Sequence, residues 1–449
     1  MFKKAYKEQH ITFRTLFKKG DIATKLSFIV MGAANLANRQ ITKGLIFLMA
    51  EVGFFAWFIK NGVHALAMLQ TLGTKKQGLT YDNNLGIEVL QKGDNSMLLL
   101  LFGISAILVC IVMIILYVIN LKSARHLYEL KAAGDPIPTL KNDLNSLVNE
   151  RFHMTLMTIP LLGVLFFTVL PLLYMVSIAF TNYDHTHLPP KNLFTWVGLK
   201  NFSNVITGDM ASTFFPVLSW TLIWAIFATI TCFFFGIILA LLINAKGIRF
   251  KKMWRTIFVV TIAVPQFVSL LTMHNLLNDA GPINAILKNM GLITQSIPFL
   301  TDPTLAKISI IMVNMWIGIP TTMLISTGII QNLDQEQIEA AQIDGANKLQ
   351  IFKSITFPQI LFVMMPSLIQ QFIGNINNFN VIYLLTGGGP SNSNYYGAGS
   401  TDLLVTWLYN LTVNTMDYNL ASVIGILIFI LSAVFSLWAY TRTNSYKEA

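Results

Sequence analysis

The sequence predicts an all-α membrane protein in which eight helices cross the bilayer. Hydrophobic residues make up 54% of the 449 positions and charged residues only 12%, about half the charged fraction of an ordinary soluble domain. The apolar residues are gathered into blocks, several of about 20 residues or more, the length that crosses a hydrocarbon core of roughly 30 Å. Lys and Arg are unevenly divided between alternating loops, as expected of a chain that crosses a membrane repeatedly.

Each apolar block is bounded by a more polar loop. The predicted spans cover 44–59, 97–121, 154–182, 216–244, 256–278, 307–331, 358–386 and 419–441. The first span is the shortest and carries Glu51 in its middle. The stretch 26–37 before it is suited to lie flat in the membrane interface.

The distribution of basic residues predicts the orientation. Of the 31 Lys and Arg residues, 23 lie in 1–43, 122–153, 245–255, 332–357 and 442–449, and the other 8 lie in the loops of the opposite side. Since basic loops stay in the cytoplasm, both termini are expected there, in the plasma membrane of the cell. The net charge of +10 follows from this topology, and we expect no nucleic-acid partner.

Spans three to eight are expected to form the working core, with the first two as an accessory pair. The predicted parts are a cytoplasmic tail 1–43, the accessory pair 44–121, a cytoplasmic linker 122–153, the core 154–441 and a tail 442–449. The long, basic tail 1–43 has no apolar segment followed by a cleavage site, so it is not a signal peptide. Cys110 and Cys232 lie inside apolar runs, so neither indicates an extracellular disulfide or a metal site.

The loop 332–358 predicts two short helices folded about a glycine. Asp334 is placed to cap the first helix with Gln337 as its capping-box partner, and Gly345 is placed to end it. The second helix is expected from Asn347 to Ile355, before Pro358 starts the next span. Its apolar face comprises Ile338, Ala341, Leu349, Phe352 and Ile355. An apolar face beside Glu336 and Glu339 suits docking of a soluble partner, and packing on the chain itself is the alternative.

The same loop resembles the EAA loop of binding-protein-dependent ABC importer permeases. The matching residues are Glu339, Ala340, Ala341, Asp344, Gly345, Ala346, Phe352, Ile355 and Pro358. The resemblance implies the type I permease core, with this loop as a coupling helix in a cleft of the ATPase subunit. It also implies that Glu339 contacts the ATPase and that Gly345 sets the turn.

Six further segments resemble the larger permease of maltose-type importers, over about 150–445. They are Trp196–Phe202, Ala263–Ser269, Val313–Pro320, Asn375–Phe379, Leu384–Pro390 and Tyr396–Val405. The resemblance implies a second permease subunit, two ATPase subunits, an extracellular sugar-binding protein and maltose or maltodextrin as substrate. Raffinose-type or other oligosaccharides are the alternative. The loop 183–215 departs from the pattern, because some members carry a folded domain there that helps to hold the binding protein.

The seventh span carries amides and no charge. Gln371, Asn375 and Asn378 share one helix face, and amides both donate and accept hydrogen bonds, which suits a neutral, hydroxyl-rich ligand. Bonding between helices is the alternative. The family resemblance implies a midmembrane sugar site at these positions and at Ile262, Gln266, Trp316, Ile317, Gly318 and Thr321. Relatives can have an aromatic residue at Ile262 and serine at Gln266 and Gln371, so the exact sugar stays open, as does whether this subunit holds it.

Other functions find less support in the residues. No G-x-x-x-x-G-K-[ST] sequence occurs, so ATP and Mg²⁺ are expected on a partner ATPase, with no cofactor, metal or catalytic residue in this chain. Spans three to eight hold no Asp or Glu, which argues against an ion-coupled transporter. A membrane-embedded enzyme would need an intramembrane catalytic pair, and none is found. Glu51 and His274 are expected to be structural, and His185 and His187 lack a third metal ligand.

The glycine run 386–390 allows two interpretations. Three successive glycines permit positive φ angles and close backbone approach. The run is either a flexible turn or a surface close to the docked binding protein.

Overall fold

The computed structural model describes residues 12–82, 86–245 and 247–442. Within these residues, seven helices are long and apolar enough to cross a membrane, and a bent pair brings the number up to eight when it is counted as one span. The predicted all-α polytopic class is therefore confirmed. Residues 1–11 of the first predicted tail, and all but the first residue of the tail 442–449, lie outside the described residues.

The chain divides into two compact units, Met1–Val197 and Gly198–Ala449, which are described separately. The division falls after the third span. The first two spans were predicted to be accessory and the other six to form the working core. These roles are functional, and they stay predictions.

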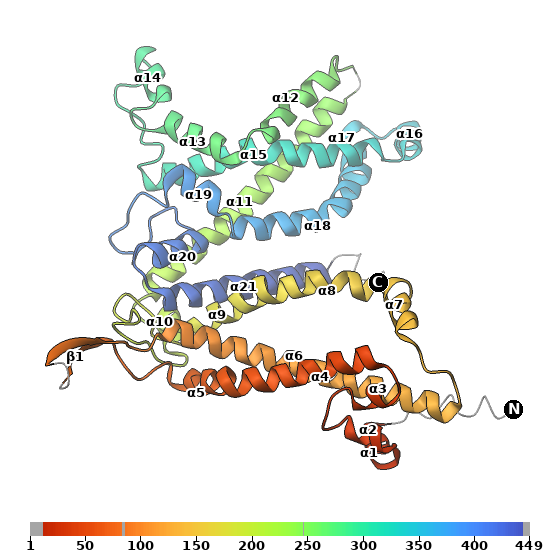
Figure 1. Ribbon diagram of the computed structural model, residues 1–449. Coiled ribbons are helices and arrows are strands. Elements are labelled where there is room, and N and C mark those ends of the chain that lie inside the picture. Colours follow the sequence, from red (N-terminus) through yellow and green to blue (C-terminus); the bar gives the residue numbers. More distant parts are fainter. Residues whose placement is uncertain (1–11, 83–85, 246, 443–449) are drawn as a thin grey trace. The chain divides into compact units, whose positions relative to one another are not determined.

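The first unit holds three spans, with small helices at one end and a hairpin at the other (Figure 1). Its elements are α1 (Phe13–Lys19), α2 (Ile22–Leu26), α3 (Ala33–Ala37), α4 (Ile41–Trp57), α5 (Val63–Thr71), β1 (Gly78–Asp82), β2 (Ile87–Gln91), α6 (Ser96–Ala133), α7 (Leu140–Val148), α8 (Phe152–Val164) and α9 (Leu170–Ile178). A π-helical turn joins α4 to α5 and another joins α8 to α9, so each pair forms one span. β1 and β2 pair antiparallel, with Leu79 opposite Leu90.

The carboxylate in the first span holds the N-terminal segment. Glu51 Oε2 accepts a hydrogen bond of 2.8 Å from the backbone N–H of Met31, and Met31 is fully buried. Asn120 of α6 fixes the same turn, because its Oδ1 accepts from Gly32 N at 2.8 Å. A buried N–H without an acceptor costs roughly 1–3 kcal/mol, so these bonds support a structural role for Glu51.

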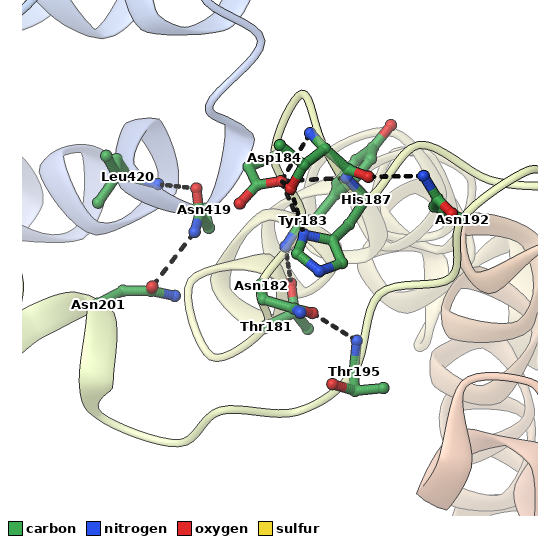
Figure 2. A network of polar contacts seen from close by, with 11 residues as sticks. Thr181, Asn182, Tyr183, Asp184, His187, Asn192, Thr195, Asn201, Asn419 and Leu420 are labelled. Carbon is green, nitrogen blue, oxygen red and sulfur yellow. Dashed lines mark hydrogen bonds and ion pairs between the residues drawn. The ribbon is translucent and has the colours of Figure 1, made fainter.

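Polar side chains fold the connection that follows α9. Asp184 Oδ1 lies 2.8 Å from His187 Nδ1, and Asn182 Oδ1 accepts a bond of 2.6 Å from Thr195 N (Figure 2). His187 therefore has a partner inside its own loop. Within the described part of the chain, no group of three or more His, Cys, Asp or Glu side chains is placed to hold a metal.

The second unit contains the remaining spans. Its elements are α10 (Lys200–Thr207), α11 (Ala211–Asn244), α12 (Lys251–Ala263), α13 (Gln266–Leu277), α14 (Pro282–Asn289), α15 (Pro303–Gln331), α16 (Gln335–Ile343), α17 (Lys348–Ile351), a π-helical turn (Phe352–Thr356), α18 (Phe357–Ile376), α19 (Phe379–Thr386), α20 (Leu404–Val413) and α21 (Tyr418–Thr441). Figure 1 shows α16 at one end of this unit and α14 and α19 at the other.

Small residues let α11 and α15 pack closely. A Cβ atom on Gly236 would lie 2.5 Å from Thr322 Cβ, and one on Gly318 would lie 2.5 Å from Cys232 Sγ. Close approach at small residues is a common mode of association between membrane helices. These two helices form the centre of the unit.

Two spans of this unit are broken. α12 and α13 meet at Val264 and Pro265 with a bend of 91°, because proline lacks the N–H needed to continue a helix and restricts the residue before it. α18 ends at Ile376 and α19 begins at Phe379. Helices are found at both predicted spans, 256–278 and 358–386, but each span was predicted as one helix and consists of two.

The two outer segments, α13 and α19, pack on each other. His274 Nδ1 lies 2.6 Å from the carbonyl oxygen of Leu385. Leu270 of α13 and Ile382 of α19 belong to one buried cluster. His274 therefore joins two helices, in line with the structural role expected for it.

Candidate functional site

The loop between α15 and α18 begins with a capped helix. Asp334 Oδ1 accepts a hydrogen bond of 2.9 Å from Glu336 N, so the predicted cap is confirmed. Its predicted partner is wrong, because Gln337 instead accepts a bond of 2.9 Å from Gln359 Nε2. The capping box forms later, where Asn347 and Gln350 exchange bonds of 2.8 and 2.9 Å.

The helix ends at the predicted glycine. Gly345 has φ +83°, and its N–H donates to Gln342 O at 3.1 Å while Ala346 N donates to Ala341 O at 2.9 Å. These two bonds form a Schellman motif, which favours glycine at the left-handed position. The stop predicted at Gly345 is confirmed.

The predicted break before Pro358 is wrong. The second helix runs on from Lys348 to Ile376 as one helix of 29 residues. The π-helical turn Phe352–Thr356 lies just before Pro358, so the hydrogen-bond pattern of the helix changes where the missing N–H of proline interrupts it. The coupling segment, which we define as 332–358, is therefore continuous with the seventh span.

One part of the coupling segment is anchored. The ring of Phe352 lies 5.6 Å from that of Phe357 and packs with Ile237, Ile360 and Met364. The predicted apolar face is thus partly used within the chain.

Another part of the coupling segment is exposed. The side chains of Ile343 and Leu349 are 86% and 59% exposed, and the acidic residues Glu339 and Asp344 are exposed with them. An exposed surface of apolar and acidic side chains is suited to a soluble partner.

The predicted sugar residues lie around the two helix breaks and on α15. Ile262 and Gln266 flank the bend between α12 and α13, and Asn375 and Asn378 flank the break after α18. α15 packs on α12, α13, α18 and α19. Polar groups at interrupted membrane helices are a recurrent feature of transporter sites.

The three amides of the seventh span differ in their partners. Asn375 is 7% exposed, and its Nδ2 donates to Thr229 Oγ1 at 2.9 Å. Asn378 caps α19 by accepting from Val381 N at 3.2 Å. Gln371 is half-buried and takes part in no side-chain hydrogen bond within the described ranges. Asn375 and Asn378 thus serve the fold, whereas Gln371 remains open to a ligand.

The predicted sugar residues of α15 are partly exposed and partly used in packing. Trp316 is 54% exposed and Thr321 is exposed. Ile317 packs against the buried cluster that contains Trp220 and Trp224, and Gly318 lies against Cys232. Ile317 and Gly318 therefore serve the packing of α15 on neighbouring helices.

A buried carboxylate that the sequence analysis missed lies between α19 and α20. Asp402 is 1% exposed. Its Oδ2 accepts from Gly399 N at 2.8 Å and from Asn410 Nδ2 at 3.4 Å, but its Oδ1 has no hydrogen-bond partner in the described part of the chain. Burial raises the pKa of Asp402 to about 6. The signal in the sequence is that residues 387–418 contain no Lys or Arg to pair with it.

The glycine run lies directly over Asp402. Gly387 and Gly388 have φ +62° and +84°, and a Cβ atom on Gly388 would meet the Asp402 carboxylate. Thr401 N donates to Gly388 O at 3.1 Å. A cavity of about 380 Å³ adjoins this turn. The turn is thus held by packing and hydrogen bonds, and its part in docking stays open.

Comparison with known proteins places this chain among membrane transport components. The profile of the family "Binding-protein-dependent transport system inner membrane component" matches residues 232–445. The galactooligosaccharides transport system permease protein GanP of Bacillus subtilis is 36% identical over 423 residues, covering 94% of this chain and 97% of that protein. The maltodextrin transport system permease protein MdxF of the same organism is 36% identical over 442 residues, covering 96% and 98%.

A partial match and a solved structure agree with this placement. The maltose/maltodextrin permease MalF of Vibrio parahaemolyticus is 34% identical over 250 residues, which cover 54% of this chain and 47% of that protein. A bacterial ABC transporter that imports alginate has a chain with a TM-score of 0.56 at 21% identity, covering 67% of this chain and 98% of that chain. That likeness shows the fold.

Proposed function

The chain belongs to the family of binding-protein-dependent transport system inner membrane components, and on that premise we propose that it is a membrane-spanning subunit of an ATP-driven importer of maltose and maltodextrins. The observation that carries the proposal is the near-full-length similarity to a maltodextrin permease. The exposed helix α16, capped by Asp334 and ended by Gly345, supports it as the element that meets an ATPase. Galactooligosaccharides are the second candidate substrate, because their permease is equally similar.

In this proposal the chain itself hydrolyses nothing. Two ATPase subunits would bind ATP and Mg²⁺, and one of them would receive the coupling segment on the cytoplasmic side. A second permease subunit would complete the pathway, and an extracellular binding protein would deliver the sugar. Glu339 and the apolar residues Ile343 and Leu349 would make the contact with the ATPase, since all three side chains are exposed.

The sugar would pass the two helix breaks, where backbone and amide groups can replace water around its hydroxyls. Gln371, Gln266, Thr321 and Trp316 are the accessible members of the predicted set. Ile262, also exposed, would contribute an apolar contact, and Asn375 and Asn378 would hold the break in shape. Amides and a Trp face bind neutral saccharides through hydrogen bonds and ring stacking.

Replacement of Glu339 tests the coupling contact. In proteoliposomes containing this chain, its partner permease, the ATPase and the binding protein, we expect Glu339→Ala to lower ATP-driven maltodextrin uptake at least about tenfold, the effect of losing roughly 1.4 kcal/mol. Sugar-loaded binding protein should no longer stimulate ATP hydrolysis. Glu336→Ala, in the first turn of the same helix, is the matched control and should retain uptake. Transport without any ATPase, or driven by a proton gradient, would refute the proposal.

The amides of the seventh span give a second test with two different signatures. Gln371→Ala should lower uptake or shift sugar preference between maltodextrins and galactooligosaccharides by about 10- to 100-fold. Thermal stability should stay unchanged, because the Gln371 side chain makes no hydrogen bond to the described part of the chain. Asn375→Ala should also lower thermal stability, since it leaves Thr229 without its donor. Asn377→Ala, at the exposed residue that follows the last residue of α18, is the control. If Gln371→Ala leaves uptake and preference unchanged, this amide is not a sugar contact.

A further inference from the structure

One side chain joins the ends of three spans beside the coupling segment. Asn244 is the last residue of α11, and its Oδ1 accepts from Arg255 Nη2 of α12 at 3.1 Å and from Gln331 Nε2 of α15 at 3.2 Å. Its Nδ2 donates to Ala240 O at 2.7 Å and to Thr327 Oγ1 of α15 at 3.2 Å. Both protons and both lone pairs of the carboxamide are therefore in use.

The backbone of Asn244 takes part as well. Lys251 Nζ, at the start of α12, donates to Asn244 O at 3.0 Å. Asn244 is half-buried, so these bonds are only partly screened by solvent. We call Asn244, Arg255, Lys251, Thr327 and Gln331 the Asn244 cluster.

The cluster links a firmly packed pair of helices to a loosely packed one. α11 and α15 approach each other closely at Gly236 and Gly318. α12 has no fully buried residue among those described, and it touches α11 and α15 through the half-buried Phe258 and Val259. Several large side chains of α12 are exposed, namely Met253, Trp254, Ile257, Val260 and Ile262. Polar bonds to Asn244 are thus a main attachment of the free end of α12.

The other end of α12 is the break in the fifth span. α12 stops at Ala263, and the chain turns by 91° before α13 begins at Gln266. A helix attached at one end and bent sharply at the other can turn about the bend as a rigid piece, as hinged elements do.

The cluster also lies next to the coupling segment in the chain. Gln331 is the last residue of α15, and Asp334, the cap of α16, follows three positions later. Any shift of α16 that moves the end of α15 changes the bond from Gln331 to Asn244. The same oxygen of Asn244 holds Arg255 of α12, so the two attachments share one acceptor.

We propose that Asn244 is a positioning residue that transmits movement of the coupling segment to α12, and through α12 to the bend that carries Ile262 and Gln266. The proposal rests on the proposed function. Its physical basis is the shared acceptor: α15 and α12 are held by the same carboxamide, beside a loosely packed helix with a hinge.

The test measures sugar taken up per ATP hydrolysed by the reconstituted complex with maltodextrin. Asn244→Leu has a similar volume but no side-chain hydrogen bonds, and we expect the uptake per ATP to fall about 5- to 10-fold while ATP hydrolysis continues. Asn244→Asp keeps the acceptor for Arg255 and Gln331 and strengthens the bond to Arg255 by charge, but it loses the two protons donated to Ala240 O and Thr327 Oγ1. It should keep the uptake per ATP near that of the unmutated complex, with both rates lowered together.

A control and a second variant separate this role from mere stability. Thr231→Val removes a hydroxyl that donates only to Phe227 O within α11, and it should change nothing. Arg255→Met removes the bond from α12 to the Asn244 side chain and leaves the bonds to α15 and the bond from Lys251 to Asn244 O. It should reproduce the loss of uptake per ATP, whereas Arg255→Lys should restore part of it.

An unchanged uptake per ATP in both Asn244→Leu and Arg255→Met would overturn the proposal, even if thermal stability fell. That outcome would make the cluster purely structural. Failure of the unmutated complex to couple uptake to ATP is a different result, because it would overturn the proposed function itself.

Discussion

Gly388→Ala is expected to destabilise the second unit by about 3–4 kcal/mol. The left-handed backbone, with φ +84°, costs a residue with a Cβ atom roughly 1–2 kcal/mol. The added methyl group would also meet the carboxylate of Asp402, and overpacking in a filled region costs a further 1–3 kcal/mol. The carboxylate cannot move aside freely, because it is 1% exposed and bonded to Gly399 N. Thermal unfolding of the purified protein in detergent measures the effect.

The neighbouring glycine supplies the matched control. Gly387 has φ +62°, and a Cβ atom there would meet no heavy atom within 4 Å. Gly387→Ala should therefore show only the backbone cost, about 1–2 kcal/mol. Combining Gly388→Ala with Asp402→Ala should recover part of the lost stability, because residues in contact are not additive. Equal losses at Gly387 and Gly388 would show that the contact with Asp402 does not matter.

The sequence predicted the features that depend on local chemistry. Blocks of apolar residues located the spans, because length and hydrophobicity alone decide whether a helix can cross a bilayer. Asp334 and Gly345 were recognised as helix ends because a cap and a left-handed stop are set by the residue itself. The family to which the chain belongs was expected from the resemblance of the loop from Glu339 to Pro358 to the EAA loop of importer permeases.

Details that depend on contacts in the folded chain were not predicted. The second short helix was expected to end at Ile355 with Pro358 starting the next span, but a π-helical turn before Pro358 joins the two into one helix. Gln337 fits the capping-box pattern, but Gln359, which follows in α18, takes its side chain instead. The spacing of Asn375 places it on the helix face expected to bind a ligand. Only the structure shows that its amide donates a hydrogen bond to Thr229. For Gln337 and Asn375, a partner elsewhere in the chain competes with the local pattern.

Asn244 and Asp402 are two residues whose importance the sequence alone did not indicate. An amide at the end of an apolar span is unremarkable in sequence, and its importance comes from Arg255 and Gln331 meeting at one oxygen. Asp402 resembles any polar loop residue until its burial is known. The absence of Lys and Arg from 387–418 was the one clue that its charge has no local partner.

Asp402→Asn is expected to stabilise the protein at neutral pH and not at acid pH. Burial raises the pKa of Asp402 from the model-peptide value of 3.8 to about 6, so the folded state binds this proton more tightly than the unfolded state. The wild-type protein therefore loses stability as the pH rises from about 4 to about 6, and the loss then stays constant. A pKa shift of about two units corresponds to a loss of about 3 kcal/mol in the free energy of unfolding. The uncharged Asn side chain does not cause this loss.

Thermal unfolding midpoints of wild type and variant between pH 4.5 and 8 measure this difference. The variant should gain steadily up to about pH 6 and then keep a constant advantage, because only the wild-type side chain titrates. Asp209→Asn, which removes an exposed carboxylate of the same unit, should show no such rise. A gain that is equal at every pH would mean that the Asp402 charge is already compensated. The contact with Gly388 would then act through shape alone, and burial of the Asp402 carboxylate would carry no electrostatic cost.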